Sequence, residues 1–321
     1  MIAAGPASQD MDEPFTSQCE VPVAGGRLTV ARAGLQIRRA DRVVLALHGI
    51  TASHMAWRAV ARGLIAEGAT CVLAPDLRGR GASSHLPAPY GSAAHVADLL
   101  KVLDYLDLPP VSLAGHSMGA YVAARFAVEH PERVLSLLLL DGGLPIPVPP
   151  DKEPDEALVS TLGPALKRLG QTYATREEYV SMWRMHPAFA HAWNADVEAY
   201  VNYDLGPALD APAPGGVRSV VSPDAVWTDG RELIVDEPTR EAAYRVRTPI
   251  RLLRAPRGLL DDDRPLIPRQ VLKDFALARP DAALEDVPDT NHYTLLLGEG
   301  PGPARVVAAF TRDHGHDGMS R

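Results

Sequence analysis

Apolar residues along the chain follow two alternating periods. Short runs that are mostly or alternately apolar predict strands, and stretches with apolar residues three or four positions apart predict helices. The predicted strands are residues 27–32, 43–47, 70–74, 111–114, 134–140, 250–253 and 283–287. The predicted helices outside the middle of the chain are residues 56–67, 96–106, 118–129, 270–278 and 303–311. Strands that alternate with helices predict an α/β fold, with a mostly parallel, doubly wound sheet that carries helices on both faces.

The alternation stops after residue 143 and resumes near residue 249. Prolines open this stretch, and a helical pattern rich in aromatic residues follows. We therefore expect a helical cap at residues 144–248, inserted after the sixth strand. The core domain would comprise residues 21–143 and 249–312, preceded by a polar leader at 1–20 and followed by a flexible tail at 313–321.

Composition narrows the classes of partner. The chain has 321 residues, 46% of them apolar, and a net charge of −8, which disfavours binding to nucleic acid or to an anionic membrane. No signal peptide and no apolar run long enough to span a bilayer is visible, so we expect a cytoplasmic protein. Cys19 and Cys71 are far apart and are expected to be free thiols.

The segment Gly115-His116-Ser117-Met118-Gly119 is a G-x-S-x-G motif. It follows a predicted strand and opens a predicted helix, which is the context of a nucleophile elbow. In that turn Ser117 would present its hydroxyl at the carboxyl end of the sheet. The alternative is a serine in an ordinary glycine-rich loop.

A serine hydroxyl needs a base within hydrogen-bond reach. His292 is the candidate, because it lies in a polar loop between the last predicted strand and the closing helix. The competing interpretation is a surface-loop histidine.

The segment Leu47-His48-Gly49-Ile50-Thr51 ends an early buried strand. A backbone N–H in this loop can join the N–H of the residue after the nucleophile to stabilise an oxyanion. These donors would be Ile50 and Met118, with His48 as a structural residue of the loop.

Together these motifs resemble the serine hydrolases of the α/β-hydrolase family. The resemblance rests on residues 48–51, 74–81, 115–119 and 291–293, which occur in the order expected for the family. It covers nearly all of the chain outside the leader. It implies the α/β-hydrolase fold, an enzyme that hydrolyses ester bonds with a Ser-His-Asp triad, and no cofactor or metal. Epoxide hydrolases and dehalogenases of this fold would need an aspartate where Ser117 stands.

The acid of the triad has two candidate positions. In most members of the family it follows the seventh strand, which here leads to Asp261, Asp262 and Asp263. An insert at residues 255–258 moves these aspartates away from the strand. Asp141 directly ends the sixth strand, where a minority of the family carries the acid. Asp141 is favoured, and the later cluster stays open as the alternative.

The position of Asp141, 24 residues after Ser117, resembles that of hydrolases that open the macrocyclic lactone zearalenone. This resemblance implies a small-molecule ester or lactone substrate. A C–C bond hydrolase and a non-catalytic binding protein of the same fold are the alternatives, and a homo-oligomer is left open. The residues expected to bind substrate are Thr51, Leu144, Trp183, His186, Trp193 and Tyr293.

Overall fold

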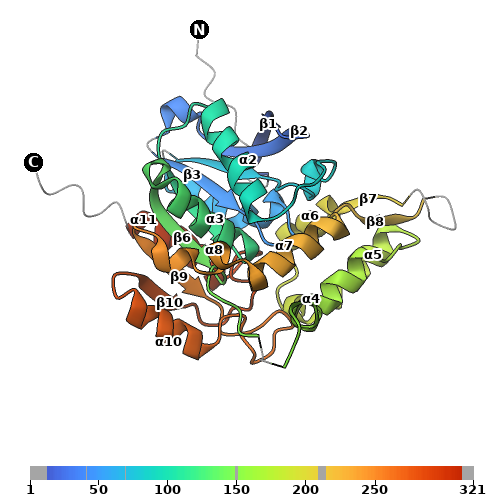
Figure 1. Ribbon diagram of the computed structural model, residues 1–321. Helices are drawn as coiled ribbons and strands as arrows, with labels where there is room; N and C mark the ends of the chain where they lie inside the picture. Colours follow the sequence, from blue (N-terminus) through green and yellow to red (C-terminus); the bar gives the residue numbers. More distant parts are fainter. Residues whose placement is uncertain (1–12, 41, 69, 149–150, 209–214, 313–321) are drawn as a thin grey trace, which may run out of the picture.

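The structure is a computed structural model that describes residues 13–40, 42–68, 70–148, 151–208 and 215–312. Its centre is an eight-stranded sheet in the order β1-β2-β4-β3-β5-β6-β9-β10 (Figure 1). From β4 to β10 all neighbouring strands pair in parallel, whereas β1 and β2 form an antiparallel hairpin and β2 pairs antiparallel with β4. The strands are β1 Phe15–Val23, β2 Gly26–Gly34, β3 Arg42–Leu47, β4 Thr70–Pro75, β5 Val111–His116, β6 Val134–Leu140, β9 Ile250–Arg254 and β10 Ala283–Asp286, with a separate pair β7 Leu205–Pro207 and β8 Val217–Ser219.

Helices cover both faces of this sheet, as the alternating pattern predicts. The α-helices are α1 Arg58–Ala66, α2 Ser92–Tyr105, α3 Met118–Glu129, α4 Pro154–Leu169, α5 Arg176–Arg184, α6 Ala195–Tyr203, α7 Pro223–Val235, α8 Glu237–Arg240, α9 Ala242–Arg245, α10 Arg269–Ala278 and α11 Pro301–Arg312. Short 3-10 helices span Ile37–Arg39, His54–Trp57, Gly81–Ser83, Pro131–Arg133 and Pro187–Phe189.

Alternate residues of the central strands enter two different cores. Leu45 of β3 and Leu113 of β5 pack with residues of α2 and α3 on one face. Val44 and Ala114, their neighbours along the chain, pack with residues of α1 and α11 on the other face. Because side chains alternate across a strand, a strand buried on both faces is apolar throughout. This burial explains the continuous apolar runs in the sequence.

The hairpin formed by β1 and β2 corrects one expectation. Residues 15–20, assigned above to a polar leader, belong to β1, and residues 1–12 lie outside the described part of the chain. β1 is an edge strand whose outward side chains are polar, so only Phe15 and Val21 are buried. That polar alternation hides the strand in the sequence.

The segment between β6 and β9 contains α4 to α9 and the β7–β8 pair. α4 packs on α7, while α8 and α9 contact α3 of the core. The end of this segment is thus continuous with the helical layer on the sheet. The domain limits at residues 144 and 248 stay a prediction, and the tail at 313–321 lies outside the described residues.

No helix in the described ranges is both long and apolar enough to cross a membrane.

Candidate active site

The turn between β5 and α3 holds Ser117 in a backbone conformation that few L-residues adopt, with φ 54° and ψ −122°. The flanking glycines make this turn possible. A Cβ atom on Gly115 would lie 2.1 Å from the carbonyl oxygen of Gly119, and one on Gly119 would lie 2.5 Å from that of Leu47. Such strain persists only where the surrounding structure enforces it, and it concentrates at functional sites. The sharp turn leaves Ser117 half-buried at the carboxyl edge of the sheet.

A buried aspartate–histidine pair lies at the same edge. Asp141 directly follows β6, and its N–H donates to the carbonyl of Leu253 in β9 at 2.8 Å. Its Oδ2 is 2.7 Å from Nδ1 of His292, and its Oδ1 accepts a weaker bond from the Ala255 N–H at 3.3 Å. A carboxylate accepts at Nδ1 only if Nδ1 carries the proton, so Nε2 of His292 is left as the basic nitrogen.

The later aspartates have other partners. Asp261 pairs with Arg257 at 2.8 Å, Asp262 pairs with Arg264 at 2.7 Å, and Asp263 is exposed. Of the two positions considered in the sequence, the structure therefore brings Asp141 to the histidine.

The loop after β3 fixes the peptide group between Gly49 and Ile50. The Gly49 carbonyl accepts hydrogen bonds from the N–H of Ala52 at 3.1 Å and from Nδ1 of His48 at 2.8 Å. In a trans peptide the N–H points away from the carbonyl, so fixing the carbonyl also aims the N–H of Ile50. The second predicted donor, Met118, is the first residue of α3, where backbone N–H groups lack partners within the helix.

His48 is held in the neutral form that this arrangement requires. Its Nε2 accepts from the N–H of Leu77 at 2.9 Å, which leaves the proton on Nδ1. Burial lowers the pKa of His48 to about 4. His48 is therefore a structural residue of the loop, as the sequence predicts, and it orients the peptide that carries the Ile50 N–H.

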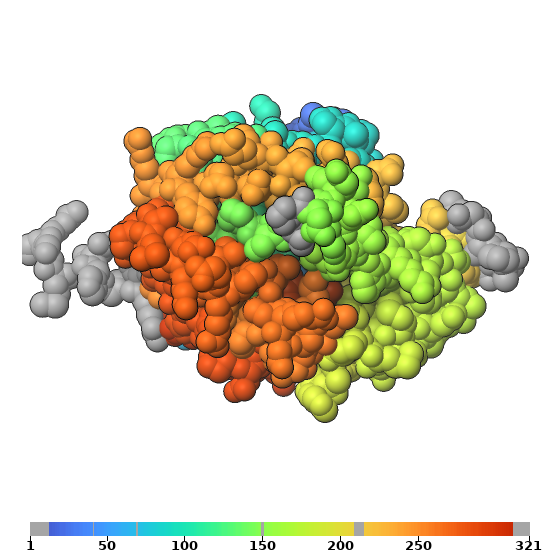
Figure 2. Space-filling model, turned by 60° about the horizontal axis from the view of Figure 1, so that its bottom comes forward, coloured from blue at the N-terminus to red at the C-terminus, as the bar shows by residue number. Residues whose placement is uncertain are grey.

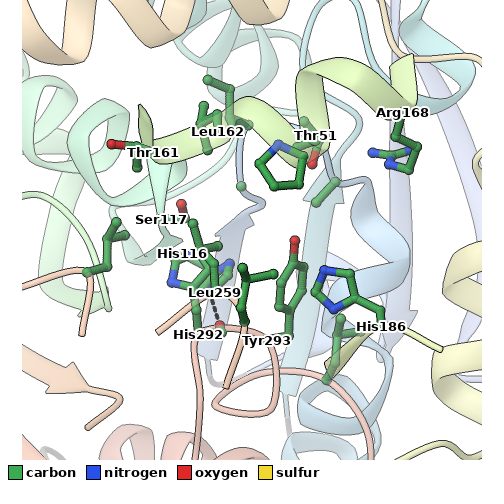
Figure 3. A pocket seen from close by; sticks show the side chains of 18 of the residues that line it. Thr51, His116, Ser117, Thr161, Leu162, Arg168, His186, Leu259, His292 and Tyr293 are labelled. Carbon is green, nitrogen blue, oxygen red and sulfur yellow. Dashed lines mark hydrogen bonds between the residues drawn. The ribbon is translucent and has the colours of Figure 1, made fainter. Parts of the chain in front are cut away.

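His116, the variable residue before Ser117, contacts the loop of His292. Its Nε2 donates to the His292 carbonyl at 2.9 Å, and the two rings lie 4.6 Å apart (Figure 3). Burial, and then the nearby His292, hold the pKa of His116 well below the usual range. A neutral His116 thus anchors the His292 loop. The sequence carries no signal of this contact, because the motif leaves that position unspecified.

Ser117 and His292 line a cavity of about 490 Å³. Figure 2 shows the surface hollowed between α4 and the loop that follows β9. Five of the residues predicted from the sequence to bind the oxyanion or the substrate line this cavity. They are Ile50, Thr51, Trp183, His186 and Tyr293.

Among the residues predicted to bind substrate, Leu144 and Trp193 do not line the cavity, and neither does Met118, the second predicted oxyanion donor. Leu144 is buried in the core, and its carbonyl accepts a hydrogen bond from the Tyr121 hydroxyl. The Trp193 indole N–H donates to Glu198 at 3.3 Å, and its ring packs edge-on against Phe189. Leu144 and Trp193 therefore serve packing, Leu144 in the core next to the end of β6 and Trp193 within the aromatic cluster of the cap.

One buried, charged residue of the cavity was not among the residues predicted from the sequence. Arg168, near the end of α4, is only 5% exposed and lines the cavity. In the sequence it follows Lys167 near a helix C-terminus, where basic side chains are common and usually solvated.

Within the described ranges, no group of three or more His, Cys, Asp or Glu side chains is arranged to hold a metal ion. Cys19 and Cys71 are both free thiols.

A strained serine between a strand and a helix, beside a buried aspartate–histidine pair at the carboxyl edge of a mostly parallel sheet, is the architecture of an α/β-hydrolase site. Residues 42–180 match the family model described as the alpha/beta hydrolase fold. The chain has the α/β-hydrolase fold, and the matched stretch, which includes Ser117 and Asp141, is similar to this family.

Individual relatives match only part of the chain. An uncharacterised protein of Mycobacterium tuberculosis is 35% identical over 112 residues, which cover 35% of this chain and 32% of the relative. Epoxide hydrolase 2 of Siraitia grosvenorii is 39% identical over 99 residues, covering 30% and 31%. The matched stretch thus spans about a third of these curated relatives.

The fold match extends much further. The thioesterase domain from the curacin biosynthetic pathway aligns over 92% of this chain and 99% of its own, with a TM-score of 0.70 and 22% identity. At that identity the likeness establishes the fold, and the predicted α/β-hydrolase fold is confirmed.

Proposed function

We propose that the protein is a serine hydrolase that cleaves carboxylic esters. The proposal rests on one observation, the 2.7 Å hydrogen bond between Asp141 and Nδ1 of His292 in a site whose serine is held at φ 54°. Ser117 is the nucleophile, His292 the general base, and Asp141 the acid that orients the imidazole.

The reaction proceeds in two halves. Ser117 Oγ attacks the ester carbonyl while Nε2 of His292 takes its proton, and Asp141 stabilises the imidazolium that forms. The backbone N–H groups of Ile50 and Met118 stabilise the tetrahedral oxyanion, an effect worth about 3 kcal/mol per donor in comparable sites. His292 then protonates the leaving alcohol, and in the second half it activates water, which releases the acid from the acyl-enzyme.

The cavity favours a bulky, mainly apolar ester. Its volume of about 490 Å³ lies within the range of sites for drug-sized molecules, and much of its wall is aliphatic or aromatic. A macrocyclic lactone such as zearalenone is the narrower proposal, supported by the 24-residue spacing from Ser117 to Asp141.

The similarity to an epoxide hydrolase does not favour epoxide opening in this chain. In the resemblance described above, that chemistry needs an aspartate at the position that Ser117 occupies. A C–C bond hydrolase would use the same three side chains. Only the substrates that the protein cleaves can therefore distinguish it from an esterase.

The test is acid release in a pH-stat with simple esters, small lactones, zearalenone and a vinylogous diketone. We expect release from esters or lactones, and Ser117→Ala should lower kcat by about 10⁴-fold or more because the nucleophile is lost. Ser181→Ala, which removes an exposed hydroxyl on α5, is the matched control and should keep wild-type activity.

Cleavage confined to the diketone would replace the proposal by a C–C bond hydrolase. Binding of these compounds without turnover by wild type would favour a non-catalytic relative.

A further inference from the structure

The cavity contains one buried cation with an unused donor. The Nη2 atom of Arg168 is buried and has no hydrogen-bond partner among the described residues. Figure 3 shows Arg168 near His186 and Tyr293, on the side of the cavity away from Ser117. An unpaired guanidinium N–H in a buried position costs free energy unless something accepts its hydrogen bond.

The other terminal nitrogen of Arg168 is fully engaged. Nη1 donates to Asp204 Oδ2 at 2.6 Å and to the Tyr179 hydroxyl at 2.7 Å. Asp204 also accepts from the Ser219 hydroxyl at 2.7 Å and from Tyr179. This network fixes the plane of the guanidinium, so the direction of the free Nη2 is set before any ligand arrives.

The charge of Arg168 is balanced within the same network. Burial alone opposes the charged form, but the neighbouring Tyr179 and Asp204 outweigh it and raise the pKa of Arg168. The guanidinium carbon also lies 5.0 Å from the centroid of the Trp183 ring, whose face attracts a cation. Since Asp204 already neutralises it, a second carboxylate would bring an uncompensated charge into a mostly apolar cavity.

We infer that Arg168 is a specificity-determining residue that binds a neutral acceptor oxygen, a ketone or hydroxyl group, on the substrate at a distance from the scissile ester. This inference rests on the proposed function for the identity of the scissile bond. The substrate class it defines is an apolar ester or lactone with one distal carbonyl or hydroxyl oxygen.

The experiment compares three esters that differ only at the distal position, which carries a ketone, a methylene or a carboxylate. For wild type we expect kcat/KM to be about 10- to 100-fold higher for the keto ester than for the methylene ester, the range of one hydrogen bond to a charged donor. The carboxylate ester should be the poorest of the three.

Two variants test whether Arg168 is the cause. Arg168→Met alone leaves Asp204 buried without its partner and can impair folding, so the double variant Arg168→Met/Asp204→Asn removes both charges together. In either variant the keto preference should fall to about threefold or less. Arg264→Met, which removes an arginine 85% exposed at the rim of the cavity, is the control and should keep the preference.

Binding to Ser117→Ala separates this inference from the proposed function. Calorimetry with the keto and methylene compounds should show the same preference without any turnover. A preference in binding with no hydrolysis by wild type would overturn the proposed function alone. Equal affinities, a preferred carboxylate, or a preference that survives in the double variant would overturn the role of Arg168.

Discussion

Two buried histidine–aspartate pairs in this molecule are nearly the same in geometry and differ in their surroundings. His292 and Asp141 are joined at 2.7 Å, and His54 and Asp76 at 2.9 Å, with each histidine bonded through Nδ1. All four side chains are at most 5% exposed. The pair alone therefore does not identify a catalytic site.

The two pairs differ in how many of their hydrogen-bonding positions are already occupied. Asp76 accepts from the backbone N–H groups of His54 and Ala82 and from the Tyr203 hydroxyl, at 2.7 to 2.9 Å, besides the imidazole. The His54 ring packs edge-on against Phe15 and Tyr203. This pair is closed on all sides and joins the loop after β4 to the end of α6.

The pair of His292 is open on one side. Asp141 has one other acceptor contact, with the Ala255 N–H, and the imidazole faces the cavity that Ser117 lines. Saturated polar groups stabilise a fold, whereas a basic nitrogen beside a cavity is available for proton transfer. The following three predictions separate these two roles.

The largest effect is expected for Asp141→Asn. The amide cannot hold the imidazole in its Nδ1–H tautomer as a carboxylate does, and the analogous change in serine proteases lowers kcat by about 10⁴-fold. Steady-state kinetics on the best ester measures this loss, and circular dichroism checks that the variant is folded. Activity within tenfold of wild type would contradict this assignment and point to Asp261, Asp262 or Asp263 as the acid of the triad.

Asp76→Asn should have the opposite profile. The NH2 group of the asparagine would face the N–H and O–H donors that the carboxylate of Asp76 accepts from, so donor would oppose donor in a buried position. The free energy of unfolding should therefore fall by about 3 kcal/mol. At temperatures where the variant is folded, kcat should stay within a few-fold of wild type. Urea denaturation together with kinetics measures both quantities, and a loss of kcat comparable to that of Asp141→Asn would erase the distinction between the pairs.

The pH dependence of stability gives the smallest and most specific signal. Burial alone would raise the pKa of Asp76, but the hydrogen bond and charge interaction with His54 outweigh it and hold this pKa below its usual value. A carboxyl with a lowered folded-state pKa stabilises the fold fully above its unfolded pKa, about 3.9, and loses this contribution as the pH falls toward the folded value. The stability gap between wild type and Asp76→Asn should therefore narrow below about pH 4, by at most about 1.4 kcal/mol per pH unit. Denaturation curves at pH 7, 4 and 3 measure the gap, and a constant gap would show that Asp76 does not titrate differently in the folded state.

The sequence predicted most of the central sheet, because strands buried on both faces leave continuous apolar runs. It missed β1, an edge strand with polar outward residues, and so placed residues 15–20 in a leader. Apolar periodicity arises from burial, so an edge strand that is largely exposed shows little of it.

Within the site, the local turns were readable and the long-range contacts were not. The glycines around Ser117 specify the elbow, since each allows a backbone approach that a side chain would block. The choice between Asp141 and the later aspartates depended on which loop meets His292, 151 residues further along the chain. The burial of Arg168 in the cavity could not be predicted for a similar reason, because its partner Asp204 lies 36 residues away in the sequence.

The pairing of β6 with β9 has a consequence for how this architecture can vary. These strands are parallel neighbours, and Ile250, the first residue of β9, pairs with Leu137. The segment between the strands therefore leaves the sheet at its carboxyl edge and returns to its amino edge through α8 and α9, which contact α3. Closing a loop costs little more entropy as the loop grows. The part of this segment that covers the cavity can accordingly be lengthened, shortened or exchanged, while Ser117 and Asp141, which directly follow β5 and β6, keep their positions. The catalytic residues at the sheet edge and the inserted segment that shapes the cavity can therefore change independently of each other.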